Sequence, residues 1–304
     1  MADLHQPWKR RKAAKENGLP GEAIDEAVSR SQRPLTVIEP KTGWRLVDWR
    51  ELREYQDLFF FLIWRNIKVR YAQSALGVGW AVLQPVATMV VFTVIFGRLV
   101  GVETDGAPYA IFAFVALVPW TYFSNSLTDG TSSMVTNADM ISKIYFPRLI
   151  MPMAVIGART VDFLIAFGIL LLLLAAYRIM PNAGIVVLPL LVVILTLSAA
   201  GAALWLTALA IQYRDINYGM SFGVQLLMYA APVVYPASLI PEKYQLLYAI
   251  NPMVGVIEGF RAALLGTRAM PWDFIAIGAV VSILLFVSGM LYFRRKEHVF
   301  ADVA

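Results

Sequence analysis

An uncharged run of residues constrains this chain more than any other feature of its sequence. From Tyr71 to Gly97 there is no Lys, Arg, Asp or Glu. A helix that crosses a bilayer needs about 20 consecutive, mostly apolar residues, and this run is longer than that. A core helix followed by a core strand is the alternative, but the length of the run favours a membrane. We therefore expect the segment to enter a bilayer as a helix.

The segment before that run has the pattern of an amphipathic helix. At helical spacing its charged residues share one side and its apolar residues gather opposite them. The polar side is rich in Arg and the apolar side carries aromatic residues, which is typical of a helix lying in the headgroup plane. We expect an interfacial helix within residues 46–72. The residues of the polar side are Arg50, Glu51, Arg53, Glu54, Asp57, Arg65 and Lys68, and those of the apolar side are Leu52, Tyr55, Phe59, Leu62, Ile63 and Ile67.

Composition supports an integral membrane protein and excludes several kinds of site. Of all residues, 59% are hydrophobic and 15% are charged, with a mean hydropathy of +0.62. The absence of cysteine excludes disulfides and thiolate metal sites. The two histidines, His5 and His298, lie near opposite ends of the sequence, which disfavours a histidine metal cluster. We expect neither a metal nor a catalytic residue.

The basic residues are concentrated before the first predicted crossing. Fourteen of the 26 Lys and Arg residues precede Gln73. The positive-inside rule explains such a flank better than nucleic-acid binding does, so we place the polar tail, residues 1–45, in the cytosol. Arg294, Arg295 and Lys296 follow the last apolar segment and place the C-terminus on the same side.

If both ends of the chain lie on the same side of the membrane, the chain must cross it an even number of times. We predict an all-α membrane domain over residues 73–304 with six transmembrane helices. The predicted crossings are residues 78–99, 109–127, 150–177, 185–211, 218–235 and 274–293.

Two of the connections between these crossings have the pattern of short helices. In the first, Asn137 is a possible cap and Phe146-Pro147 a stop, which predicts a short cytosolic helix over residues 137–145. A plain re-entry turn is the alternative. The second connection, residues 235–271, is too apolar for an exposed loop. It predicts two short helices, 244–250 and 253–265, that turn at Asn251-Pro252 and dip back into the membrane.

Four stretches resemble the permease subunit of ABC-2 type polysaccharide exporters. They are LREYQDLFFFLIWRNIKVRYAQSALGVGWAVLQP, NADMISKIYFPRLIMP, the Arg-Asp pair in QYRDI, and INPMVGVIEGFRAALLG. The resemblance extends from about Pro34 to the C-terminus, and its first stretch is the most specific. The tail before Pro34 resembles nothing that we can name.

The resemblance implies partners, a location and roles for particular segments. The chain is expected to pair with a second copy of itself in the bacterial inner membrane. Two separate ABC ATPase subunits would carry the ATP and Mg²⁺, since this chain has no Gly-rich phosphate loop and binds no cofactor itself. The cargo would be a lipid-linked polysaccharide of the O-antigen, capsule or teichoic acid kind. The residues expected to couple to the ATPase are Arg65, Arg70, Asn137, Lys143, Phe146, Arg148, Arg214 and Asp215, and those of a periplasmic gate over about 236–266 are Tyr244, Tyr248, Asn251, Pro252, Glu258 and Arg261.

A sugar pathway would have to rely on aromatic and polar side chains, because the crossings carry almost no charge. Flat amphipathic rings can contact the apolar faces of sugars without selecting one linkage. The candidate channel residues are Trp80, Gln84, Phe92, Phe96, Tyr218, Phe222, Tyr229 and Tyr235. Membrane-interface or packing roles are the alternative for each aromatic residue. Arg159 and Asp162 are spaced to form a structural ion pair on one helix turn.

Two other functions compete with polysaccharide export. One is an ABC-2 permease for a small lipid or drug-like cargo. The other is a membrane glycosyl or phosphoglycosyl transferase, which would need clustered carboxylates or a metal. Around the far-side segment the sequence offers only Glu242, Glu258 and Asp273 and no nearby histidine, so the enzyme is the weakest of the three.

Overall fold

The computed structural model describes residues 53–72, 77, 79–213 and 215–297, and within them every regular element is a helix. The all-α prediction is confirmed. In chain order the elements are α4 (Gln56–Tyr71), α5 (Gly79–Phe92), the π-helix η1 (Thr93–Val100), α6 (Tyr109–Thr136), α7 (Ala138–Lys143), α8 (Ile150–Ala176), the 3₁₀ helix η2 (Ala183–Val187), α9 (Leu188–Gln212), α10 (Asp215–Tyr229), the 3₁₀ helix η3 (Ala237–Leu239), α11 (Glu242–Tyr248), α12 (Pro252–Leu265) and α13 (Trp272–Lys296).

Five helical segments of the described part are long and apolar enough to cross a membrane. They are α5 with η1, then α6, α8, η2 with α9, and α13. The fifth predicted crossing, residues 218–235, is not confirmed. Its helix, α10, has 15 residues and is therefore about 22 Å long, short of the ~30 Å hydrocarbon core. The chain leaves the helix after Tyr229 and turns through Ala230 and Pro232, which the apolar composition of the segment did not reveal.

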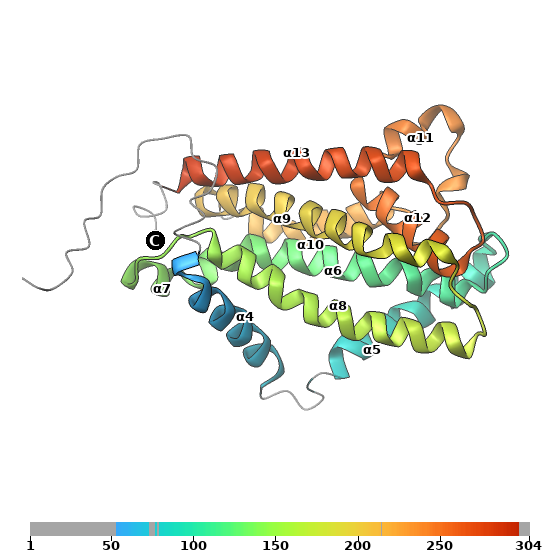
Figure 1. Ribbon diagram of the computed structural model, residues 1–304, viewed down its shortest axis with the longest axis horizontal. Helices are drawn as coiled ribbons and strands as arrows, with labels where there is room; N and C mark the ends of the chain where they lie inside the picture. The colour runs from blue at the N-terminus through green and yellow to red at the C-terminus, as the bar shows by residue number, and fades with distance from the viewer. Residues whose placement is uncertain (1–52, 73–76, 78, 214, 298–304) are drawn as a thin grey trace, which may run out of the picture. The chain divides into compact units, whose positions relative to one another are not determined.

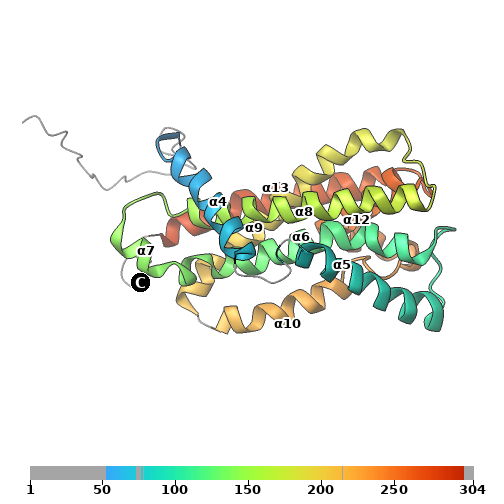
Figure 2. The same cartoon turned by 90° about the horizontal axis from the view of Figure 1, so that it is seen from below.

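The helix α6 forms the centre of the bundle and packs against α8 and α9 (Figures 1 and 2). Within its most apolar stretch 78% of the residues are buried, whereas in the span formed by α5 and η1 the share is 6%. Small residues let α9 and α13 lie close together. A Cβ added to Gly201 would lie 2.5 Å from the backbone nitrogen of Phe286, so only glycine fits there without movement of the backbone.

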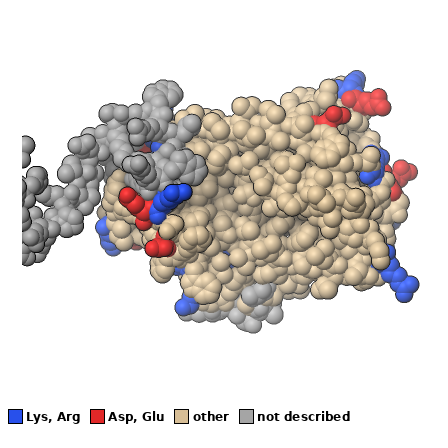
Figure 3. Space-filling model, in the orientation of Figure 1, with Lys and Arg blue, Asp and Glu red and all other residues tan. Residues whose placement is uncertain are grey.

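The bundle has two opposite ends, which we call the α7 end and the α11 end. The α7 end holds α4, α7 and the last turn of α13, and the α11 end holds α11 and the connections before α6 and α13 (Figure 1). Charged side chains gather at both ends, and the surface between them is uncharged on the face shown in Figure 3. Such a charge-free belt is what a bilayer requires of a spanning protein.

The predicted interfacial helix corresponds in part to α4, which packs along α8. Residues 46–52 of the prediction lie outside the described residues. Leu62 is fully buried and Ile63 contacts Gly157, as expected for the apolar side. The outward side of α4 is not purely polar, as the predicted two-sided pattern implied. Phe60, Phe61 and Trp64 are exposed there, each by about 60%. Aromatic residues mixed with charges are suited to the headgroup region.

Candidate functional site

The C-terminal end of α4 is held to the bundle by a group of charged residues, which we call the charge cluster: Arg70, Tyr71, Asp129, Arg159 and Asp162. Arg70 donates from Nη1 to Asp162 Oδ2 at 2.7 Å and lies 3.4 Å from Asp129. Arg159 donates to Asp129 at 2.8 Å and to Asp162 at 2.9 Å. Tyr71 donates its hydroxyl to Asp162. Three helices, α4, α6 and α8, thus meet at two arginines and two aspartates.

The cluster is balanced in charge and partly withdrawn from solvent. Its four charged side chains are between 16% and 33% exposed. Burial and the hydrogen bond to Asp162 raise the pKa of Tyr71 to about 12, so the phenol keeps its proton at neutral pH. The predicted ion pair between Arg159 and Asp162 is confirmed. Sequence reasoning missed Asp129 as its neighbour, and the only available signal was that this carboxylate stands near the end of an otherwise apolar helix.

A second junction links the middle of α4 to α7. Arg65 donates to Asn137 Oδ1 at 2.6 Å and approaches the sulfur of Met140 at 3.5 Å. Asn137 stands at the predicted cap position of α7, but within the described residues its side chain makes no capping bond to that helix. Its amide instead donates to the Ser133 carbonyl at 2.8 Å. The side chain of Asn137 therefore joins α4 to the end of α6. The prediction that it caps α7 is wrong.

The other predicted coupling residues differ in their exposure. Lys143 is exposed at the end of α7. Phe146 is buried in the same apolar cluster as Leu62, so it anchors this segment to the bundle rather than forming outer surface. Arg148 donates to the backbone oxygen of Glu297 at 2.5 Å. Asp215 is the first residue of α10, and Arg214 lies outside the described residues.

At the α11 end, a buried ion pair joins Glu258 and Arg261 one turn apart on α12. The Nη1 of Arg261 lies 2.9 Å from Glu258 Oε1, and both side chains are less than 10% exposed. Arg261 also donates to the carbonyls of Val233 and Tyr235, at 3.0 and 3.2 Å. Its guanidinium lies 3.6 Å from the ring centre of Phe112. The pair therefore holds the turn after α10 against α12 and α6.

The predicted gate residues form a connected hydrogen-bonded group with the end of α10. Tyr248 donates to the hydroxyl of Tyr235 at 3.2 Å, and Tyr235 donates to the Tyr229 carbonyl at 2.8 Å. Asn251 accepts from the Met253 amide and caps α12, while its own amide donates to Ala230. Tyr244 and Pro252 line an open, mostly apolar hollow of about 600 Å³ beside this group. The predicted helices 244–250 and 253–265 correspond closely to α11 and α12.

Comparison with known proteins agrees with this architecture. Residues 57–265 match the family model described as "ABC-2 type transporter". The chain belongs to this family. It is 30% identical, over 82% of its length and 96% of the relative, to the O-antigen export system permease protein RfbA of Myxococcus xanthus. It is 28% identical to the Klebsiella pneumoniae protein of that name, over 81% and 95%, and 22% identical to the polysialic acid transport protein KpsM of Escherichia coli, over 78% and 92%.

In this ABC-2 transporter seven of the predicted channel residues lie on α5, η1 and α10, which pack along the same side of α6 (Figure 2), and the eighth, Tyr235, lies in the turn after α10. Those of α10 are the more open, with Tyr218 85% and Phe222 65% exposed. Phe92 and Phe96 are half-buried and contact each other edge to face with 5.6 Å between ring centres. Tyr235 is half-buried. The remaining three members are exposed, namely Trp80, Gln84 and Tyr229.

Some of the aromatic residues outside the candidate channel are packing residues. Trp120 and Tyr122 are each 5% exposed within α6. Among the described residues, no group of three or more His, Asp or Glu side chains could hold a metal ion. The contacts described above are joints between helices.

Proposed function

We propose that this ABC-2 transporter is the permease subunit of an exporter that moves lipid-linked polysaccharide, of the O-antigen or capsule kind, across the bacterial inner membrane. The observation that carries the proposal is similarity over nearly the whole length of the Myxococcus relative, whose name states O-antigen export. The membrane-spanning bundle and the exposed aromatic side chains of α5 and α10 suit such a cargo. Hydrolysis of ATP would take place on a separate subunit.

A second copy of the chain would complete the pathway. The segment formed by α5 and η1 is the least buried of the five spans, so one copy alone leaves most of its surface uncovered. A twofold axis would place α5 and α10 of one protomer opposite those of its partner. Sugar rings would then slide along aromatic faces such as Tyr218 and Phe222, while polar groups such as Gln84 meet their hydroxyls.

The α7 end is the surface proposed to bind the ATPase subunits. Lys143, Ile144 and Tyr145 are exposed there, the last two by 57% and 63%. Movement of α7 would reach α4 through the Arg65–Asn137 hydrogen bond and reach the bundle through the charge cluster. Closure of the ATPase pair could in this way shift the interface helix against α6 and α8.

Charge reversal on α7 tests this coupling. We expect Lys143→Glu to abolish polysaccharide export, because the exposed ammonium lies on the proposed docking surface, while the permease still assembles as a dimer. Surface polysaccharide and copurification of the ATPase subunit would be measured together. Lys243→Glu is the matched control, since Lys243 is exposed at the α11 end and should not affect docking. Normal export with a bound ATPase in the Lys143→Glu variant would refute the docking surface.

Cysteine labelling tests the orientation, and the native chain contributes no background because it has no cysteine. A cysteine introduced after Lys296 should be protected from a membrane-impermeant maleimide in intact cells and should react after lysis. Met180→Cys should react from outside, because Met180 is 90% exposed at the α11 end. Labelling of the C-terminal cysteine from outside would overturn the proposal that this end is cytosolic.

A further inference from the structure

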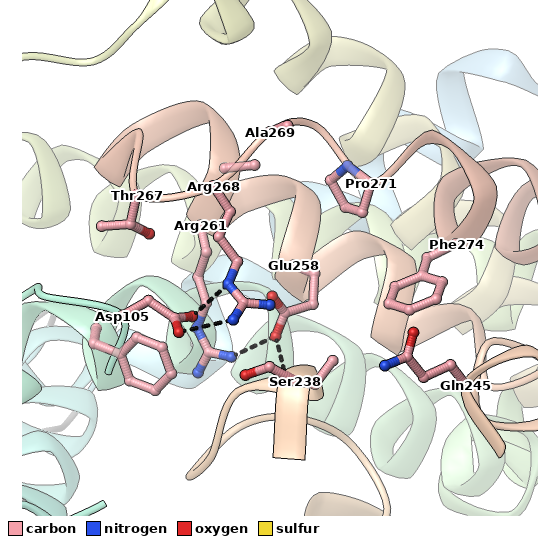
Figure 4. Close-up of a pocket in the computed structure, with 13 residues that line it drawn as sticks. Asp105, Ser238, Gln245, Glu258, Arg261, Thr267, Arg268, Ala269, Pro271 and Phe274 are labelled. Atoms are coloured by element: carbon pink, nitrogen blue, oxygen red, sulfur yellow. Dashed lines mark hydrogen bonds and ion pairs between the residues drawn. The ribbon is translucent and has the colours of Figure 1, made fainter. Parts of the chain in front are cut away.

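A small cavity with a mixed polar and apolar lining lies at the α11 end, beside the buried ion pair and away from the faces of α5 and α10. Its volume is about 130 Å³, and its lining comes from the connection before α6, from η3, α11 and α12, and from the start of α13. One water occupies roughly 10–15 Å³ on this measure, so the cavity has room for about ten non-hydrogen atoms. Figure 4 shows Arg261 and Glu258 of α12 and Asp105 of the connection before α6 converging on it.

The charged groups of the cavity wall cancel in pairs. Arg261 is paired with Glu258 inside the protein, and Arg268 lies 2.9 Å from Asp105 at the mouth. An anionic ligand would have to compete with both carboxylates for the two guanidinium groups. The wall therefore does not favour a phosphate or a carboxylate as ligand.

The wall also holds hydrogen-bonding side chains that carry no charge. The Nε of Arg261 is not among the groups that a ligand can reach, because this atom is itself buried, although it has no hydrogen-bond partner among the described residues. Gln245 and Thr267 supply polar side chains, and the ring of Phe274 supplies apolar surface, whereas Phe112 is 2% exposed and lies under the Arg261 guanidinium. Donors, acceptors and ring faces with no net charge match a neutral polyhydroxylated ring.

We propose that this cavity is a binding site for one uncharged hexose unit on the exit side of the protein. A hexose has 12 non-hydrogen atoms, close to the capacity of the cavity. Its hydroxyls can accept from Arg268 and Thr267 and donate to Glu258 or Asp105, and its apolar face can lie against an aromatic ring. The assignment rests on the proposed polysaccharide cargo, and it gives each protomer a contact for the emerging chain that is separate from the channel-facing aromatics.

The site can be tested by protection of an introduced cysteine in the purified permease–ATPase complex. Thr267→Cys places an exposed thiol on the wall, and Met180→Cys places one at the same end but outside the cavity. Maleimide labelling would be timed with the methyl glycosides of glucose, galactose and mannose, with N-acetylglucosamine, and with glycerol or inorganic phosphate as controls. A sugar with a Kd of about 1 mM, given at about ten times that concentration, should slow labelling at position 267 roughly tenfold. Labelling at position 180 should not change.

Further variants separate the possible outcomes. Gln245→Ala combined with Thr267→Cys should lose most of the protection, and Ala269→Cys serves as a second reporter if the first variant does not fold. Unchanged labelling with all four sugars at both reporters would overturn the site, and equal protection by phosphate would overturn its assignment to a neutral ring. The readout requires neither export nor ATP. If polysaccharide export were disproved while the sugars still protected the cysteines from maleimide, the two results could therefore be told apart.

Discussion

Replacing Arg261 by methionine should lower the stability of the protein more than almost any other single substitution in the described bundle. The change would leave the Glu258 carboxylate buried, 7% exposed, without the cation that lies 2.9 Å from it. It would also remove the donors to the carbonyls of Val233 and Tyr235. Breaking a buried ion pair from one side costs about 3–5 kcal/mol.

The thermal unfolding midpoint of the detergent-solubilised complex would measure this loss, with Arg268→Met as the matched control. Arg268 also lies 2.9 Å from a carboxylate, that of Asp105, but its side chain is 48% exposed. Pairs as exposed as this contribute about 0–1 kcal/mol, so the control should unfold close to the wild-type temperature. Equal midpoints for the two variants would show that the buried pair does not hold the gate segment.

The double variant Glu258→Leu with Arg261→Met examines the cause of that loss. If the uncompensated carboxylate dominates, removing both charges should recover much of the lost stability, because no buried charge remains. If the bonds from Arg261 to the two carbonyls dominate, the double variant should be as unstable as the single one. Either result assigns the role of the pair, and a stable single variant would contradict it.

The short helices of the α11 end could be predicted from sequence because their signals are local. Pro252 directly follows Asn251, a pair that both stops one helix and begins another, and the structure begins α12 at Pro252. The long apolar runs likewise located the five spans. Local composition could not locate the end of α10, because Tyr229 is followed by further apolar residues. The chain turns there through hydrogen bonds to Asn251 and Arg261, which are distant in sequence.

The candidate site shows the same limit. The ion pair of Arg159 and Asp162 was predictable from its spacing on one helix turn, whereas the ion pair of Asp162 with Arg70 required the packing of α4 on α8. Asn137 was placed correctly at the start of α7, yet its partner Arg65 lies 72 positions away. A capping pattern in the sequence indicates where a helix can begin. It does not indicate which distant residue will form a hydrogen bond with the capping side chain.

The second large effect is expected at the charge cluster. Asp162→Asn would leave Arg70 and Arg159 sharing only Asp129, and Tyr71 would lose the carboxylate that accepts the hydrogen bond from its hydroxyl. Charged hydrogen bonds contribute about 1.5–3 kcal/mol each, so the end of α4 should detach from α6 and α8 for part of the time. We expect export to fall about tenfold while the permease still assembles with its ATPase. Asp273→Asn is the control, because it removes one exposed carboxylate at the α11 end.

Cross-linking distinguishes detachment of α4 from general unfolding of the bundle. Ile63 contacts Gly157, so the cysteine pair Ile63→Cys with Gly157→Cys should form a disulfide readily in an otherwise unchanged chain. Adding Asp162→Asn should slow this cross-link, and ATP hydrolysis by the complex should continue without matching export. A normal cross-linking rate together with normal export would refute the tether. A slow cross-link with fully coupled export would show instead that α4 can move freely without loss of transport, and that force from the ATPase enters the bundle through α7 alone.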